Sequence, residues 1–219
     1  MNKKYFNVPI YIWGLFLLSS AIFIFFPQID LYISTLFYDG EDFPAKGSLF
    51  ESFFYFSVKP VIIFFAFSAL TIFLYNLFKK KSILNLNAKV FLYIILVFSL
   101  APGLIVNSIL KENWERARPN QTTYFGGKKE FSPAFIVSNQ DGYSFSSGHA
   151  AAAFSIIGIA LLANKRKSLW IALAATYGVL VSIARVSAGG HFLSDVVSSF
   201  FIVFISSKIL YSLLIEKKQ

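Results

Sequence analysis

The chain has 219 residues, of which 56% are hydrophobic and only 14% are charged. Soluble domains are about 45–50% apolar and about 25% charged, so this composition excludes an ordinary soluble enzyme, a disordered protein and a disulfide scaffold. The chain has no cysteine, which excludes thiol catalysis, an iron–sulfur cluster and a cysteine zinc site. In a membrane protein, the net charge of +9 raises the question of which side the cations face.

Six apolar stretches predict an all-α integral membrane protein with six transmembrane helices. A span needs roughly 20 residues, within a range of about 17–25. The first stretch is interpreted as an uncleaved anchor, because Phe25 and Phe26 stand where a signal peptide would end in small residues. The fourth is short and has to begin at or before His149. The predicted spans are residues 9–26, 60–78, 90–110, 149–163, 168–187 and 193–214. We expect residues 1–219 to form a single membrane-embedded domain.

The lysines and arginines predict that both termini face the cytoplasm. Positive charges are enriched in short cytoplasmic segments close to the ends of spans. With the N-terminus inside, compact clusters of cations fall on the cytoplasmic side, and the outer cations are diluted by most of the acidic residues. The cytoplasmic cations are Lys3, Lys4, Lys79, Lys80, Lys81, Lys89, Lys165, Arg166, Lys167, Lys208, Lys217 and Lys218. The outer cations are Lys46, Lys59, Lys111, Arg116, Arg118, Lys128, Lys129 and Arg185.

Two long outer loops remain in this topology, residues 27–59 and 111–148. The first contains an aromatic stretch, residues 50–56. This stretch is compatible with an amphipathic helix in the membrane interface and equally with an extension of the second span. The second loop is too polar to be buried in lipid.

Ionisable and polar residues gather near the predicted outer ends of spans three to six. Such residues beside lipid are costly and usually functional. In the segment 146–149, Ser147 is a favoured N-cap, and Gly148 allows a close approach of the backbone to a ligand. The start of a helix also favours an anion. An ordinary helix start would use the same residues, so this segment alone does not decide the function.

His191 and Asp195 are four residues apart, which places them on one face if both are helical. A carboxylate beside an imidazole orients the ring, as suits a histidine nucleophile or base. A capping pair and a metal pair are the alternatives, although no convincing further metal ligand accompanies them. Lys111, Arg118 and Arg185 together offer the charges that bind phosphate, while each alone also fits an interfacial cation.

Taken together, these residues resemble three motifs of the type 2 phosphatidic acid phosphatase superfamily. The similar segments are 111–119 (Lys, six residues, Arg-Pro), 146–149 (Pro-Ser-Gly-His in the family) and 185–195 (Arg, five residues, His, three residues, Asp). They occur in the family's order, and the resemblance covers about residues 90–205. Ser146 replaces the family's usual proline and Ala184 its usual serine. Neither replacement removes a group that carries out chemistry.

The resemblance implies a phosphatase that uses neither a metal nor another cofactor and forms a phosphohistidine intermediate. It implies that His191 attacks phosphorus, that Asp195 orients it, and that His149 protonates the leaving group and then activates water. The implied phosphate-binding residues are Lys111, Arg118, Ser147, Gly148 and Arg185. The active site is then expected at the periplasmic ends of helices three to six, in the inner membrane of a bacterium.

Further segments are similar to bacterial lipid A phosphatases, slightly more to 4′-phosphatases than to 1-phosphatases. They are residues 101–107, 114–119, 131–135 and 189–195. We therefore expect a membrane-lipid substrate and no nucleic-acid partner. Lipid A is favoured, and phosphatidylglycerophosphate, undecaprenyl pyrophosphate and phosphatidic acid are the alternatives.

Other classes of protein fit these patterns less well. A transporter would place its polar residues near the midplane of the bilayer. A non-catalytic lipid-binding protein would dispense with the histidines or the aspartate, and the related vanadate-dependent peroxidases are soluble. A lipid-to-lipid phosphotransferase would use the same residues and is separated from a phosphatase only by its products.

Overall fold

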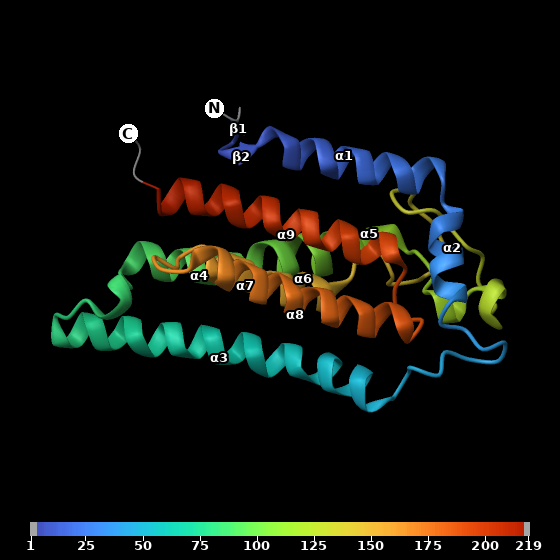
Figure 1. The fold of residues 1–219 in the computed structure, drawn as a ribbon, viewed down its shortest axis with the longest axis horizontal. Coiled ribbons are helices and arrows are strands. Elements are labelled where there is room, and N and C mark those ends of the chain that lie inside the picture. Colours follow the sequence, from blue (N-terminus) through green and yellow to red (C-terminus); the bar gives the residue numbers. More distant parts are fainter. Residues whose placement is uncertain (1–3, 217–219) are drawn as a thin grey trace.

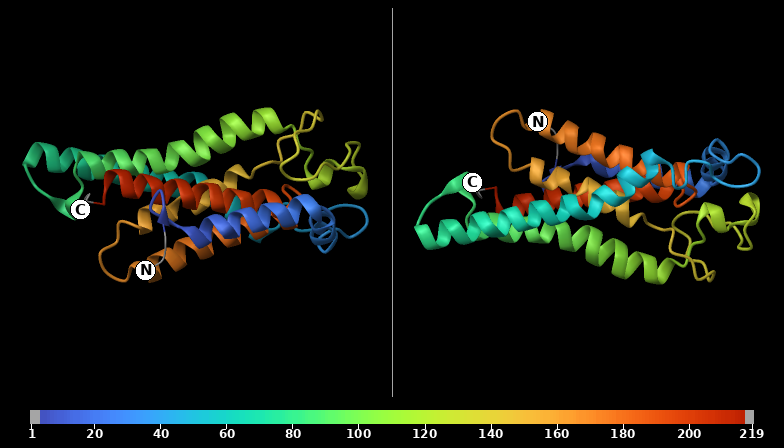
Figure 2. Two further views of the ribbon diagram at one scale, coloured as in Figure 1. Left: turned by 90° about the horizontal axis from the view of Figure 1, so that it is seen from above. Right: turned by 90° about the horizontal axis from the view of Figure 1, so that it is seen from below.

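The computed structural model describes residues 4–216, which form an all-α structure apart from one pair of two-residue strands. The long helices lie roughly side by side along one axis, as Figures 1 and 2 show. They are α1 (Ile10–Phe25), α3 (Leu49–Lys79), α4 (Ala88–Ser99), α8 (Lys167–Ser187) and α9 (Leu193–Leu214). The shorter helices are α2 (Gln28–Thr35), α5 (Lys111–Trp114), α6 (Gly148–Phe154), α7 (Ile156–Ala160), the π-helix η2 (Leu100–Leu110) and the 3₁₀ turns η1 (Ile83–Asn85), η3 (Pro119–Gln121) and η4 (Thr123–Phe125). The strands β1 (Lys4–Tyr5) and β2 (Val8–Pro9) pair antiparallel.

Four helical segments are long and apolar enough to cross a membrane: α3, Ala88–Gln121, α8 and α9. The pair α1 and α2 adds a fifth if it counts as one broken span, because the two helices meet at an angle of 84°. An all-α membrane protein is therefore confirmed. The fourth predicted span, residues 149–163, corresponds to α6 and α7, which are apolar but shorter than a full span.

The second predicted span begins much earlier than expected. Helix α3 starts at Leu49 instead of residue 60, so the aromatic stretch 50–56 extends this helix and is no separate interfacial helix. Ser48 caps the new start, since its hydroxyl accepts the backbone N–H of Glu51 at 3.2 Å. The predicted loop 27–59 is thus largely helical, because α2 also lies within it.

Small residues bring α6 close to α8 and α9. Ala150 and Ala153 are fully buried, and a Cβ atom on Gly178 of α8 would lie 2.1 Å from the ring of Phe154. Helices in membranes associate through such close backbone contacts, because lipid tails provide no hydrophobic drive between them. This packing fixes the start of α6 next to the end of α8 and the start of α9.

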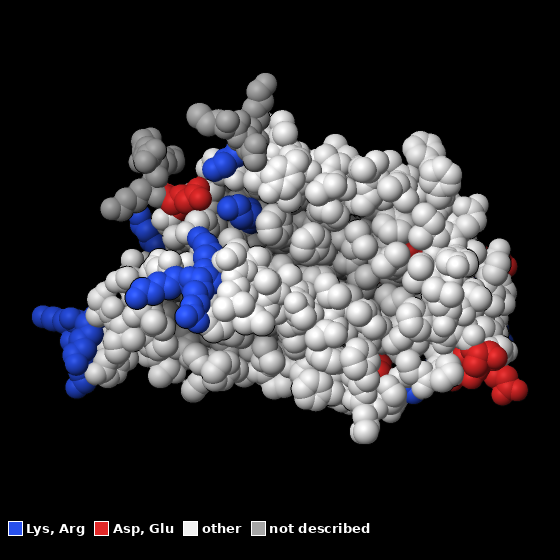
Figure 3. Space-filling model, in the orientation of Figure 1, with Lys and Arg blue, Asp and Glu red and all other residues white. Residues whose placement is uncertain are grey.

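Charged side chains gather at the two ends of the bundle, as Figure 3 shows for one face. Lysines and arginines lie mainly at the end with the α3–α4 connection and both ends of the described chain, and acidic side chains lie mainly at the other end. The surface between them is almost free of charge on this face. Of the predicted cytoplasmic cations, Lys3, Lys217 and Lys218 lie outside the described residues.

Candidate active site

The second motif (residues 146–149) contacts the third (residues 185–195) at the end of the bundle where α8 ends and α9 begins. Ser147 is buried and caps α6, since its hydroxyl accepts the N–H of Ala150 at 3.4 Å. Its carbonyl accepts the hydroxyl of Ser199 on α9 at 2.9 Å, and its N–H donates to the Asp195 carbonyl at 3.4 Å. The start of α6 is therefore fastened to the first turns of α9.

Gly148 lies close to the side chains of Asn107 and Lys111, so there is little space for a side chain at this position. A Cβ atom at this position would lie 2.5 Å from Oδ1 of Asn107 and 2.9 Å from Nζ of Lys111. Asn107 is held in turn by a 2.7 Å hydrogen bond from its amide to the carbonyl of Pro102 within η2. The amino group of Lys111 therefore lies next to the start of α6.

His191 lies in the turn between α8 and α9 and is almost fully buried. Its Nδ1 is 2.8 Å from the backbone carbonyl of Ser144. A carbonyl oxygen only accepts, so Nδ1 carries the hydrogen and Nε2 retains its lone pair. Burial lowers the pKa of His191 to about 4, against the opposing effect of the Asp195 carboxylate and with a smaller contribution from the charge of Arg185. The ring is therefore neutral at neutral pH.

The carboxylate of Asp195 lies beside the His191 ring, at a distance slightly longer than a hydrogen bond. Helix α9 begins only after the histidine, so the two residues do not share a helical face, and Oδ2 of Asp195 is 3.7 Å from Nδ1 of His191. Oδ2 accepts the hydroxyl of Ser144 at 2.6 Å and the N–H of Phe192 at 2.8 Å, and Oδ1 accepts Nη1 of Arg116 at 2.6 Å. Ser144 connects the two residues, because its hydroxyl binds Asp195 and its carbonyl binds the ring of His191.

Arg116 is a central residue of the site that the sequence analysis missed. Its side chain is fully buried and donates to Oδ2 of Asp30 at 2.8 Å and to Oδ1 of Asp195 at 2.6 Å. It also donates to the hydroxyl of Ser194 at 2.9 Å and to the carbonyl of Ser132 at 2.8 Å. Arg116 thereby joins α2, α9 and the polar loop. In the sequence it looked like another outer cation, because its partners are remote along the chain.

Helix α3 contributes two further residues that the sequence analysis did not select. Oε1 of Glu51 lies 2.6 Å from Nη1 of Arg185. The ring of Tyr55 stacks on the imidazole of His149, with a centroid separation of 4.3 Å and an angle of 24° between the planes. The guanidinium of Arg185 lies 4.8 Å from the centroid of the Tyr55 ring. The one available signal was the spacing of Ser48 and Glu51, which is typical of a capping box.

The predicted cations surround the two histidines. The charges of Arg185, Lys111 and Arg118, and His191 itself, all lie within electrostatic range of His149. The backbone after Arg118 is tied to the α8–α9 turn, where the loop N–H of residue 120 donates to the carbonyl of residue 189 at 3.1 Å. The fold thus brings the predicted site residues together, and their catalytic roles stay predictions. Within residues 4–216, no three His, Asp or Glu side chains gather closely enough to hold a metal ion.

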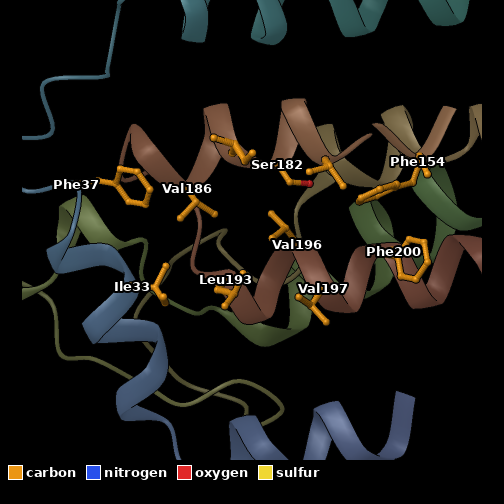
Figure 4. A pocket seen from close by; sticks show the side chains of 12 residues that line it. Ile33, Phe37, Phe154, Ser182, Val186, Leu193, Val196, Val197 and Phe200 are labelled. Atoms are coloured by element: carbon orange, nitrogen blue, oxygen red, sulfur yellow. The ribbon is translucent and has the colours of Figure 1, made fainter. Parts of the chain in front are cut away.

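An apolar cavity of about 520 Å³ lies between α8 and α9, beside α2 (Figure 4). Its walls include Phe37, Phe154, Val186, Leu193 and Phe200, and none of the charged motif residues lines it. Val186 directly follows Arg185 in the chain, so the cavity begins close to the motif residues. Such walls suit hydrocarbon and not phosphate.

Comparison with known proteins identifies the family. Residues 92–218 match the family model of the PAP2 superfamily. The chain belongs to the PAP2 superfamily. This confirms the resemblance seen in the three motifs, and the PAP2 protein is a phosphatase.

The chain is similar to lipid A 4′-phosphatases over most of its length and to a phosphatidylglycerophosphatase over less than half of it. It is 32% identical over 203 residues to a lipid A 4′-phosphatase of Francisella tularensis subsp. novicida, covering 90% of this chain and 91% of that protein. It is 34% identical over 199 residues to a lipid A 4′-phosphatase of Rhizobium leguminosarum, covering 81% and 83%. It is 33% identical over 104 residues to phosphatidylglycerophosphatase B of Bacillus subtilis, covering 44% and 45%. No solved structure matches the chain significantly.

Proposed function

We propose that this PAP2 protein removes the 4′-phosphate from lipid A through a phosphohistidine intermediate. The observation that carries this proposal is the buried imidazole of His191, whose Nδ1 faces the carbonyl of Ser144, so that Nε2 keeps its lone pair near the charges of Arg185 and Arg118. The substrate is supported by the lipid A 4′-phosphatases that are similar to nearly the whole chain. The apolar cavity beside α8 and α9 is compatible with a lipid ligand.

The chemistry needs two steps that share the same acid and base. In the first step, Nε2 of His191 attacks phosphorus, the bond between phosphorus and the sugar oxygen breaks, and that oxygen takes a proton from His149. Lys111, Arg118 and Arg185 neutralise the phosphoryl oxygens. In the second step, His149 removes a proton from water, the water oxygen attacks phosphorus, and the phosphorus–nitrogen bond breaks. Inorganic phosphate leaves, and both histidines return to their starting protonation.

The proposed topology has six spans, with both termini in the cytoplasm and the active site on the periplasmic side of a bacterial inner membrane. The spans are α1 with α2, α3, α4 with η2, α6 with α7, α8 and α9. The concentration of cations at the end away from the motif residues supports this orientation. The short span formed by α6 and α7 is largely buried among other helices, so it does not need the length of a helix that faces lipid on all sides.

The substrate is tested by mass spectrometry after the purified protein has acted on a mixture of lipids in the presence of EDTA. The mixture contains bis-phosphorylated lipid A, phosphatidylglycerophosphate, undecaprenyl pyrophosphate and phosphatidic acid. We expect selective loss of one phosphate from lipid A, with fragment ions that place the loss at the 4′ position. Hydrolysis of phosphatidylglycerophosphate alone would instead favour the activity named for the Bacillus subtilis relative. Phosphate that appears on a second lipid would identify a phosphotransferase.

The protonation state of the nucleophile gives a second prediction. A histidine attacks only in its neutral form, and burial keeps the pKa of His191 near 4, compared with an ordinary value of 6.5. The protonation of His191 should therefore not change as the pH passes through 6.5. The ring should gain a proton only as the pH falls toward about 4. The chain has only two histidines, so NMR of protein labelled at the histidine ring resolves both. We expect the His191 signal to stay constant from about pH 8 to about pH 5.

The variant His149→Gln assigns the two signals in this titration. A midpoint for His191 near pH 6.5 would show that the ring is not buried as in the structure. Full recovery of the spectrum on return to neutral pH checks that acid has not unfolded the protein.

A further inference from the structure

The active site of this protein extends to helix α3, which lies outside the part of the chain matched by the family model. Two side chains at the start of α3 contact two of the motif residues. Glu51 forms an ion pair with Arg185, and Tyr55 lies against both Arg185 and His149. We propose that Glu51 and Tyr55 are positioning residues of the phosphatase, which fix the phosphate-binding edge of Arg185 and the orientation of His149. This inference rests on the proposed phosphatase mechanism.

Glu51 is itself held rigidly before any ligand binds. Its Oε2 accepts the backbone N–H of Gly47 at 3.3 Å, while its own N–H donates to the hydroxyl of Ser48 at 3.2 Å. These two bonds, to two successive residues, cap the start of α3, where the helix dipole also favours a negative charge. The free oxygen, Oε1, points at Arg185. The carboxylate is therefore a fixed partner for the guanidinium and not a mobile surface charge.

The ion pair determines which edge of Arg185 remains for a ligand. Glu51 occupies Nη1 at 2.6 Å, whereas Nε of Arg185 is buried and has no hydrogen-bond partner among the described residues. Nη2 lies over Gly190, where a Cβ atom would come within 2.3 Å. Nε and Nη2 form one of the two edges with which a guanidinium binds two oxygens of a phosphate. A buried donor without a partner is costly, so this is the edge that receives phosphoryl oxygens in the proposed mechanism.

Tyr55 links the same guanidinium to the proposed proton donor. Its ring stacks on the imidazole of His149, with a centroid separation of 4.3 Å, and the guanidinium of Arg185 lies 4.8 Å from the centroid of the same ring. Stacking against the Tyr55 ring restricts the rotation of the imidazole. Tyr55 therefore sets the position of His149 relative to the phosphate that Arg185 binds.

The two residues are expected to affect different kinetic constants. Glu51→Ala frees Nη1 and lets the guanidinium rotate, so KM and the Kd for orthovanadate, a phosphate mimic, should both rise by about tenfold. Tyr55→Leu keeps the ion pair between Glu51 and Arg185 but releases His149, so kcat should fall by roughly 3–10-fold with a smaller change in KM. The conservative changes Glu51→Gln and Tyr55→Phe keep the acceptor and the ring, and should restore most of each loss.

The experiment measures kcat and KM on whichever lipid the wild-type protein hydrolyses, together with orthovanadate binding by calorimetry and thermal unfolding. Glu41→Ala in the exposed loop and Phe67→Leu on the exposed face of α3 are the matched controls. If Glu51→Ala and Tyr55→Leu only lower the unfolding temperature, with kcat, KM and Kd within about twofold of wild type, the pair merely fastens α3 to α8 and the inference is wrong.

The measurement of orthovanadate binding separates this inference from the proposed function. If the wild-type protein and Glu51→Ala bind orthovanadate with the same Kd, the proposed role of Glu51 is wrong and the phosphatase mechanism is unaffected. Wild-type protein that neither binds orthovanadate nor hydrolyses any lipid of the panel would refute the proposed function, and the positioning roles with it.

Discussion

The variant His191→Ala is expected to lose the phosphatase activity completely, whereas His149→Ala should lose roughly 10²–10⁴-fold, the usual contribution of a general acid. Alanine at position 191 removes the only nucleophile in the proposed mechanism, and the cations around it bind phosphate without breaking its ester bond. Alanine at position 149 leaves the nucleophile, and water can still supply a proton slowly. The two rates are compared by release of inorganic phosphate from the lipid that wild-type protein hydrolyses.

Trapping of the intermediate distinguishes these variants further. Protein mixed briefly with substrate that carries a radioactive phosphate, then denatured in base, should retain label in the wild type and in His149→Ala. The label should be acid-labile, as expected for phosphate on a ring nitrogen, and should be absent from His191→Ala. Activity of His191→Ala within about tenfold of wild type would show that water attacks phosphorus directly and that no phosphohistidine forms.

Arg116→Met is expected to destabilise the protein more than any substitution at the exposed cations. The guanidinium is the shared partner of Asp30 and Asp195, and all three side chains are excluded from solvent. Its removal leaves two buried carboxylates without a counter-charge, and the loss of one partner from a buried ion pair typically costs about 3–5 kcal/mol. The free energy of unfolding in detergent measures this cost. The activity should fall too, because Asp195 and Ser144 together hold His191.

A double substitution separates the charge effect from the loss of packing. Asp30→Asn in the Arg116→Met background removes one of the stranded charges, so it should recover part of the lost stability. Lys128→Met, an exposed cation in the same loop, is the matched control and should change stability by less than about 0.5 kcal/mol. If Arg116→Met is as stable as this control, the buried network contributes nothing to folding.

The sequence alone determined the helical membrane architecture and the residues of the three motifs. Apolar length is a local property, so the last two spans, residues 168–187 and 193–214, coincide closely with α8 and α9. The motif residues were identifiable because their chemistry and spacing are written directly in the chain, and the family match confirmed that resemblance. The predicted start of the second span, at residue 60, was wrong, because apolar length does not show where a helix begins. Helix α3 begins at Leu49, where Ser48 caps it, and it continues through Pro60.

The tertiary structure alone decided which partners complete the site. Arg116 and Asp30, which form an ion pair, are 86 residues apart in the sequence, and Arg185 and Glu51 are 134 residues apart. No local sequence pattern predicts either pair. The carboxylate of Asp195 lies beside the His191 ring, at 3.7 Å, but the two residues do not share a helical face, because His191 precedes α9. A buried charged side chain is costly unless an opposite charge lies beside it. Which opposite charge that is depends on the folding of the whole chain.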